Sequence, residues 1–200
     1  MLDARLRRML APGLSSVAHR LEPLGLRPNQ LSVWGAVAGL AAGVAIAADG
    51  LGLALALAVL SRIADGLDGP LARLHGSSDF GGYLDIVADF VFYTAVPLGF
   101  ASRDPAAAAL PTAFLLAGYV FTGVTFLAYS AVAERRHVEE GDGRSFIFQP
   151  GLTEGTETLI AYALMFAMPE QYAPIAWGYA ALCFYTALSR SILASRVFHS

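Results

Sequence analysis

The stretch DGLDGPLARLHGSSDFGGYLDIVAD, residues 65–89, decides the fold class because it places four aspartates at the edges of two strongly apolar runs. Asp65 and Asp68 are three residues apart, and Asp85 and Asp89 are four apart, so each pair lies on one helix face. A carboxylate at the bilayer centre costs about 2.5–3.5 kcal/mol, so four at full depth would cost about 10 kcal/mol, as much as a domain's whole stability. We therefore expect all four at one membrane interface, facing a wet cavity and bound to something positive.

The charge of this cluster indicates a metal ion. Two carboxylates about 5 Å apart repel by about 3 kcal/mol at an effective dielectric constant of 20, and either protonation or a divalent cation relieves this. Oxygen ligands without His or Cys suit Mg²⁺, Mn²⁺ or Ca²⁺ rather than zinc. Arg73 offers a planar fork for phosphate, and Gly69, Gly81 and Gly82 leave the backbone bare for a bulky ligand. The stretch thus predicts a metal-assisted site for a phosphate ester.

The same residues fit the pattern D-x2-D-G-x2-A-R-x8-G-x3-D-x3-D at every fixed position. They are Asp65, Asp68, Gly69, Ala72, Arg73, Gly82, Asp85 and Asp89. This pattern resembles the signature of the CDP-alcohol phosphotransferase family, the class I CDP-alcohol phosphatidyltransferases, whose best-known members make phospholipids. The resemblance implies that Asp65, Asp68, Asp85 and Asp89 hold two Mg²⁺ or Mn²⁺ ions and that Asp89 is the general base. The residues alone support the metal cluster but do not say which aspartate is the base.

The resemblance also implies a set of contacts to the CDP moiety of the donor. These are Gly69, Ala72, Arg73, Gly82, Ser78, Asn29 and Gln30. Ser78 lies seven residues before Asp85, close to where the phosphatidylinositol-phosphate-synthase branch of the family contacts the nucleotide. An N-cap role at the start of the first span explains Asn29 equally well.

Five further residues are candidates for the acceptor site: Arg62, Arg135, Glu154, Glu157 and Arg190. The two glutamates would suit a cationic alcohol such as choline or ethanolamine, or a polyol, but acids also complement a helix dipole at its N-terminus. The arginines would suit a phosphorylated acceptor such as glycerol 3-phosphate, although Arg135 also fits a plain positive-inside anchor. Arg62, one turn before Asp65, either orients that carboxylate, touches substrate or snorkels to the headgroups.

Composition indicates an all-α integral membrane protein. Apolar residues make up 56% of the chain and charged residues 14%, and the mean hydropathy is +0.56. We expect one domain, 1–200, with an amphipathic interfacial helix within 1–27 and a six-helix bundle over 28–196. The predicted spans are 31–48, a second from 51 with Asp65 and Asp68 at its far end, 82–100, 106–132, 156–168 and 172–193. The single cysteine excludes an intramolecular disulfide.

The arginines orient this layout in the membrane. Arg103 is the one arginine on one side of the six predicted spans, and all other loop arginines fall on the opposite side. The positive-inside rule therefore places both termini and the aspartate cluster in the cytoplasm. With the resemblance, this predicts a homodimeric inner-membrane enzyme that transfers a phosphatidyl group from a CDP-alcohol, above all CDP-diacylglycerol, to an acceptor hydroxyl and releases CMP.

Three other functions are compatible with the same residues. One is a choline- or ethanolamine-type transferase that acts on diacylglycerol. Another is a divalent-cation transporter, although a transporter favours acids near mid-membrane on broken helices. The third is a family member that binds lipid without catalysis. No feature of the chain points to nucleic acid.

Overall fold

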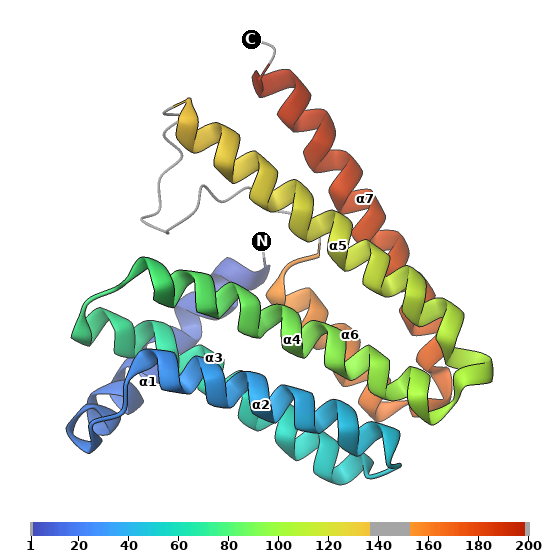
Figure 1. The fold of residues 1–200 in the computed structure, drawn as a ribbon, viewed down its shortest axis with the longest axis horizontal. Helices are drawn as coiled ribbons and strands as arrows, with labels where there is room; N and C mark the ends of the chain where they lie inside the picture. The colour runs from blue at the N-terminus through green and yellow to red at the C-terminus, as the bar shows by residue number, and fades with distance from the viewer. Residues whose placement is uncertain (1, 137–152, 199–200) are drawn as a thin grey trace. The chain divides into compact units, whose positions relative to one another are not determined.

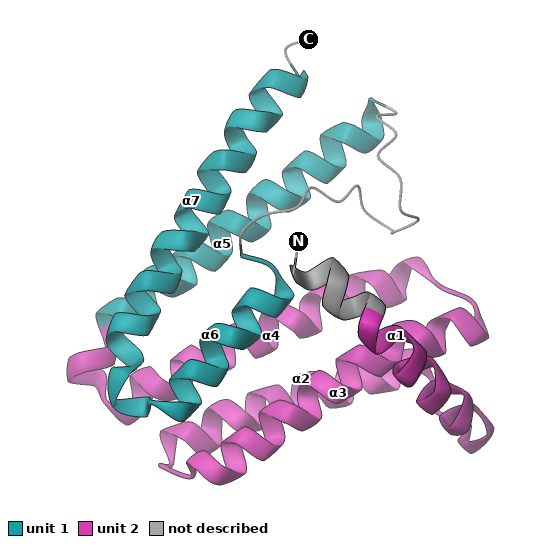
Figure 2. Ribbon diagram, turned by 180° about the vertical axis from the view of Figure 1, so that it is seen from behind, with its two compact units in different colours: residues 1–3, 110–200 teal, residues 4–109 magenta. Residues whose placement is uncertain are grey.

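The computed structural model describes the backbone of residues 2–136 and 153–198, with side chains from Met9 onward. The described residues form helices and no strand, which confirms the all-α prediction. Figure 1 shows them in chain order: α1 (Leu2–Leu21), α2 (Pro28–Ala47), α3 (Leu51–His75), α4 (Asp79–Arg103), α5 (Pro105–Arg135), α6 (Gly155–Ala167) and α7 (Tyr172–Phe198). Short 3-10 turns at Glu22–Leu24 and Pro169–Gln171 precede α2 and α7. The chain divides into two compact units, residues 4–109 and residues 1–3 with 110–200 (Figure 2).

The helix boundaries follow from local capping, with one correction to the sequence prediction. α4 begins at Asp79, three residues before the predicted start, because the Ser78 hydroxyl caps it by accepting the Gly81 N–H at 3.0 Å. α3 continues through Pro70 to His75. Asp65 and Asp68 therefore lie inside α3, and their place at the far end of the second span stays a prediction.

In unit 4–109, α3 and α4 both pack along α2. Glycines make the seam between α2 and α4 close: a Cβ on Gly99 would lie 2.5 Å from the Gly43 carbonyl oxygen, and one on Gly43 would lie 2.8 Å from the Ala95 carbonyl carbon. Small residues at such seams let helix backbones approach, as is typical of membrane proteins. The unit 4–109 is thus organised around α2.

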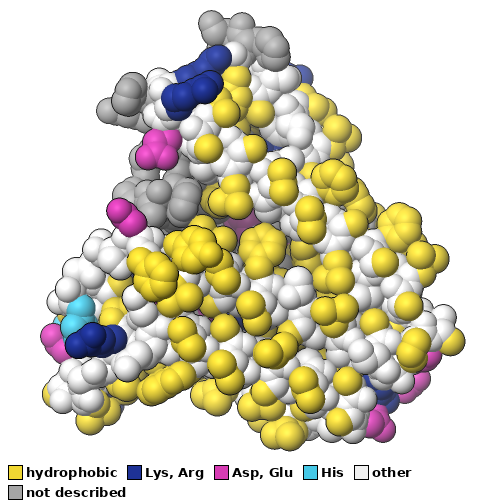
Figure 3. All heavy atoms as spheres, in the orientation of Figure 1, with side chains coloured by type: hydrophobic (Ala, Val, Ile, Leu, Met, Phe, Trp, Pro, Cys, Tyr) yellow, Lys and Arg dark blue, Asp and Glu magenta, His cyan; other side chains and the backbone are white. Residues whose placement is uncertain are grey.

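The helix α2 exposes most of its large side chains, Leu31 and Ile46 apart, and buries most of its small ones. Val37 and Val44 are 61% and 63% exposed, whereas Ala38, Gly39 and Ala42 are buried. Hydrophobic side chains likewise cover most of the face seen in Figure 3. This distribution suits a lipid surround rather than water. By length and composition, α2, α4 and α5 can cross a membrane, and α6 is a shorter apolar helix; the six-span layout as a whole stays a prediction.

The helix α1 packs on α3 within the unit 4–109. Its Ala18 is fully buried beside Leu67 and Leu71 of α3, and Leu14 and Leu21 flank the same cluster. The apolar spacing predicts a helix within 1–27, and α1 spans Leu2–Leu21 and continues past Pro12. Its contact with lipid headgroups stays a prediction.

In the unit that contains residues 110–200, buried hydroxyl pairs join α5, α6 and α7. The pairs are Thr112 with Tyr172 at 2.5 Å, Tyr119 with Tyr162 at 3.1 Å, and Thr158 with Tyr179 at 2.8 Å. Side-chain hydrogen bonds of this kind hold helices together where the hydrophobic effect between them is weak. All six side chains of these pairs are buried, so each hydroxyl finds its partner inside the unit.

Candidate functional site

The centre of the candidate site is the guanidinium group of Arg62. Its Nη1 donates to Asp89 Oδ1 at 2.6 Å and lies 3.5 Å from Asp65 Oδ2. Its Nη2 donates to Ser61 Oγ at 3.1 Å. Two aspartates that the motif places on different helices, α3 and α4, therefore flank one cation. The snorkelling alternative for Arg62 is wrong, because its guanidinium is held by carboxylates of the cluster.

Two aromatic side chains of α4, Phe92 and Tyr93, contact Arg62 and Asp89. The Arg62 guanidinium carbon lies 4.0 Å from the centroid of the Phe92 ring, and Phe92 is 1% exposed. The Tyr93 hydroxyl donates to Asp89 Oδ2 at 3.4 Å. A Cβ on Gly39 of α2 would lie 3.0 Å from the Phe92 ring, so this glycine leaves room for it. The sequence analysis did not find Phe92 and Tyr93, whose one signal is their spacing of one helical turn from Asp89.

The other two aspartates have different surroundings. Asp68 is 8% exposed, and its Oδ2 accepts a hydrogen bond from Ser32 Oγ of α2 at 2.6 Å. Asp85 is exposed on α4, one turn before Asp89. Ser32 is a further site residue that the sequence analysis missed, since a serine in an apolar run carries little signal. All four motif aspartates thus belong to one unit of the fold.

These residues fit a hard divalent cation in kind but not in their present arrangement. Within residues 2–136 and 153–198, no three His, Cys, Asp or Glu side chains are placed so that they could hold a metal ion. The physical reason is visible in the contacts, because Arg62 lies between Asp65 and Asp89 while Ser32 holds Asp68. Carboxylate oxygens remain the ligands that Mg²⁺ and Mn²⁺ prefer. Those of Asp65 and Asp89 already contact the positively charged guanidinium of Arg62.

Several predicted contacts of the CDP moiety meet at the start of α2 and α4. A Cβ on Gly81 would lie 3.3 Å from Asn29 Oδ1 and 3.1 Å from Ser78 Oγ, so the two side chains converge over one glycine. Two helix N-termini, each with a positive dipole end that suits phosphate, therefore lie side by side. The alternative that Asn29 is the N-cap of α2 is wrong: that position is Arg27, whose backbone N–H donates to Gln30 Oε1 at 3.0 Å.

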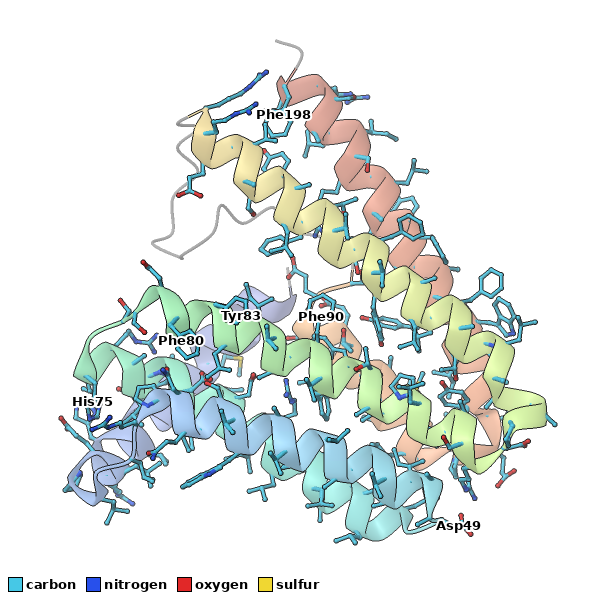
Figure 4. All side chains as sticks on the ribbon, in the orientation of Figure 1. Asp49, His75, Phe80, Tyr83, Phe90 and Phe198 are labelled. Atoms are coloured by element: carbon cyan, nitrogen blue, oxygen red, sulfur yellow. The ribbon has the colours of Figure 1, made fainter. Side chains whose placement is uncertain are left out.

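The remaining predicted contacts lie on the last turns of α3 and the first turns of α4. A Cβ on Gly69 would lie 3.8 Å from Arg73 Nη1, and the Arg73 side chain is exposed. Ala72 and Gly82 are partly exposed. Figure 4 shows the neighbouring aromatics Phe80 and Tyr83, which stack at 6.1 Å on α4. An exposed arginine beside a bare backbone is available to a phosphate group.

The other acceptor candidates lie in the unit that contains residues 110–200. Glu154 is the N-cap residue of α6, and its backbone N–H donates to Glu157 Oε2 at 3.3 Å, which supports the helix-capping explanation for Glu157. Arg190 is buried, and its Nη1 donates to the Thr122 carbonyl oxygen at 2.8 Å. Glu154 also interacts electrostatically with Arg190, so neither a purely acidic nor a purely basic group forms there. Arg135 is exposed in the last turn of α5.

Comparison with known proteins finds relatives both in sequence and in fold. The sequence is 38% identical over 192 residues to the inner membrane protein YnjF of Escherichia coli (strain K12), covering 95% of this chain and 93% of that protein. The fold is similar to that of the Mycobacterium tuberculosis phosphatidylinositol phosphate synthase PgsA1 with CDP-DAG bound, with a TM-score of 0.70 and 22% identity over 90% of this chain and 92% of that one.

A second structure of the same synthase, in complex with manganese and citrate, also has a TM-score of 0.70 and 22% identity, over 90% of this chain and 88% of that one. At this level of identity the likeness shows the fold. The family description CDP-alcohol phosphatidyltransferase matches residues 26–189, which include α2 to α6 and most of α7. The chain therefore belongs to the CDP-alcohol phosphatidyltransferase family.

Proposed function

We propose that this chain is a metal-dependent inner-membrane enzyme that transfers a phosphatidyl group from CDP-diacylglycerol to the hydroxyl of an acceptor alcohol, with release of CMP. The observation that carries the proposal is that Asp65 of α3 and Asp89 of α4 both contact one positive group, the guanidinium of Arg62. Support also comes from the fold likeness to a synthase with CDP-DAG bound and from the relative described as an inner membrane protein. The arginine distribution favours cytoplasmic termini and site, and the family resemblance favours a homodimer.

The four motif aspartates, Asp65, Asp68, Asp85 and Asp89, would hold one or two Mg²⁺ or Mn²⁺ ions. When bound, the metal would neutralise charge on the pyrophosphate and on the CMP leaving group. Manganese in a structure of the related synthase supports a divalent cation of this class. Asp65 and Asp89 would have to leave Arg62, and Asp68 would have to leave Ser32, at least in part.

The protein's own residues supply the proton transfer and the phosphate contact. The acceptor oxygen attacks the phosphorus that bears the diacylglycerol, the bond from that phosphorus to CMP breaks, and the acceptor proton passes to the Asp89 carboxylate. In the structure, Arg62 and Tyr93 already donate to the two oxygens of Asp89, so the acceptor hydroxyl has to use a remaining lone pair or replace one of these donors. Arg73 is exposed one turn beyond Gly69 and would pair with a donor phosphate.

The experiment is CMP release from CDP-diacylglycerol by purified protein in detergent with Mg²⁺. The acceptor panel holds glycerol 3-phosphate, inositol 1-phosphate, inositol, serine and choline. A second arm supplies CDP-choline or CDP-ethanolamine with diacylglycerol, which tests the amino-alcohol transferase as an alternative. We expect one acceptor to stimulate CMP release from CDP-diacylglycerol.

Two variants make the test specific. Asp89→Asn should abolish CMP release, whereas Asp79→Asn, the same change at an exposed acid in the first turn of the same helix, should leave it nearly unchanged. CMP release from CDP-choline or CDP-ethanolamine, and not from CDP-diacylglycerol, would transfer the assignment to the amino-alcohol type. If the folded protein releases CMP with no pair of donor and acceptor, the catalytic assignment is wrong and a lipid-binding role replaces it.

A further inference from the structure

Arg62 supplies a positive charge inside the aspartate cluster, although it is not one of the eight residues of the motif. It precedes Asp65 by one turn of α3 and reaches across to Asp89 of α4. Its side chain is 14% exposed, and those of Asp65 and Asp89 are 28% and 29% exposed. At this depth the three charges are only partly screened by solvent, so their mutual attraction is stronger than that of a surface ion pair.

The guanidinium of Arg62 is held by several contacts, but one of its N–H donors lacks an acceptor. It stacks on the buried ring of Phe92 at 4.0 Å and donates to Ser61 Oγ at 3.1 Å. Its Nε, however, is buried and has no hydrogen-bond partner among the described residues. A buried donor without an acceptor is destabilising. The arrangement is therefore one that another cation at the carboxylates could displace.

A divalent ion at these carboxylates would need the oxygen atoms that Arg62 now contacts. Asp89 Oδ1 is 2.6 Å from Nη1, so a metal ion bound to that oxygen would lie within a few ångströms of the guanidinium charge. Two cations that close repel strongly in a partly buried site. Metal binding and the present Arg62 contact are thus mutually exclusive, or nearly so.

We propose that Arg62 is an internal counter-ion that holds the Asp65 and Asp89 carboxylates together in the metal-free protein and competes with the divalent cation for them. The inference rests on the proposed metal role of these aspartates. It assigns Arg62 as a positioning residue of the metal site and not as an acceptor contact. The charge of Arg62 keeps two carboxylates on neighbouring helices from repelling each other while the metal is absent.

The test is Mn²⁺ titration of the full-length protein in detergent, with free Mn²⁺ measured by electron paramagnetic resonance. Arg62→Gln should bind Mn²⁺ at least tenfold more tightly than the parent protein, a change of about 1.4 kcal/mol. Its metal-free melting temperature should be lower than the parent's, and saturating Mn²⁺ should close that gap. The matched control is Arg103→Gln, which removes an arginine that contacts Asp49 Oδ1 at 2.7 Å in the same unit. Its Mn²⁺ affinity should stay within twofold.

Equal or weaker Mn²⁺ binding by Arg62→Gln would overturn the inference, because the guanidinium would then not oppose the metal. If that variant does not fold, Phe92→Leu removes the stacking ring and keeps the charge, and it too must bind Mn²⁺ more tightly. Absence of Mn²⁺ binding in parent and variants alike would overturn both the inference and the proposed metal site. Tight binding without CMP release would overturn the proposed reaction alone.

Discussion

The seam between α2 and α4 gives a prediction with a calculable size. A Cβ on Gly99 would lie 2.5 Å from the Gly43 carbonyl oxygen and 2.9 Å from Ile46 Cβ, whereas ordinary contact begins at 3.4 Å. Gly99→Ala therefore forces the two backbones apart by about 1 Å, since neither opposing atom lies at the end of a flexible side chain. Overpacking of this kind costs about 3 kcal/mol at the upper end of its range, and the better helix propensity of alanine returns about 1 kcal/mol.

The net loss for Gly99→Ala is thus about 2 kcal/mol, which corresponds to a fall in melting temperature of about 4–8 °C for a chain of this size. The assay is thermal unfolding of purified protein in one detergent, followed by loss of helical circular dichroism. The matched control is Gly178→Ala in the interior of α7, where a Cβ would meet no atom within 4 Å. There only the propensity gain operates, and the melting temperature should rise slightly. If Gly99→Ala melts as high as Gly178→Ala, the close seam is not a feature of the folded protein.

Three further predictions concern single side chains. Gly81→Ala pushes on Asn29 Oδ1, 3.3 Å from the new Cβ, so KM for the CDP donor should rise several-fold while the melting temperature changes little; unchanged donor KM would remove Asn29 from the donor site. Ser32→Ala deletes the 2.6 Å hydrogen bond to buried Asp68 and should reduce the free energy of unfolding by about 1–3 kcal/mol, measured by the same thermal assay. Cys183 is fully buried, so a maleimide should label it only after unfolding, as mass spectrometry would show; rapid labelling of folded protein would contradict its position in α7.

Much of the fold could be predicted because lipid-facing helices carry a strong signal in the sequence. The starts predicted at 51, 106, 156 and 172 agree with the starts of the helices α3, α5, α6 and α7 to within a residue. The length of α3 beyond Asp68 is less evident from the sequence, because Pro70 and two aspartates resemble a helix terminus. In the structure the helix continues past all three, with Arg73 and His75 in its last turn, where basic residues suit the helix dipole.

The pairing of the aspartates follows from the corrected helix boundaries. Asp65 lies ten residues before the end of α3, and Asp89 lies ten residues after the start of α4, with a connection of only three residues between the helices. A rise of about 1.5 Å per residue then places both carboxylates about 15 Å from the connection, at the same height on two adjacent helices. With His75 and Asp79 known as the helix ends, the sequence would have predicted that these two side chains lie at the same height.

The cation between them could not be predicted in the same way, because local spacing relates Arg62 to Asp65 alone. What selects its position is a set of residues distant in sequence: Asp89 binds the guanidinium, Phe92 supports it, and Gly39 of α2 makes room for the Phe92 ring. Both α3 and α4 pack along α2, so a change in the α2 seam would move the ring, then the guanidinium, and then the distance between the carboxylates. Gly39 of α2 therefore makes room for a side chain of the site without contributing a ligand to it.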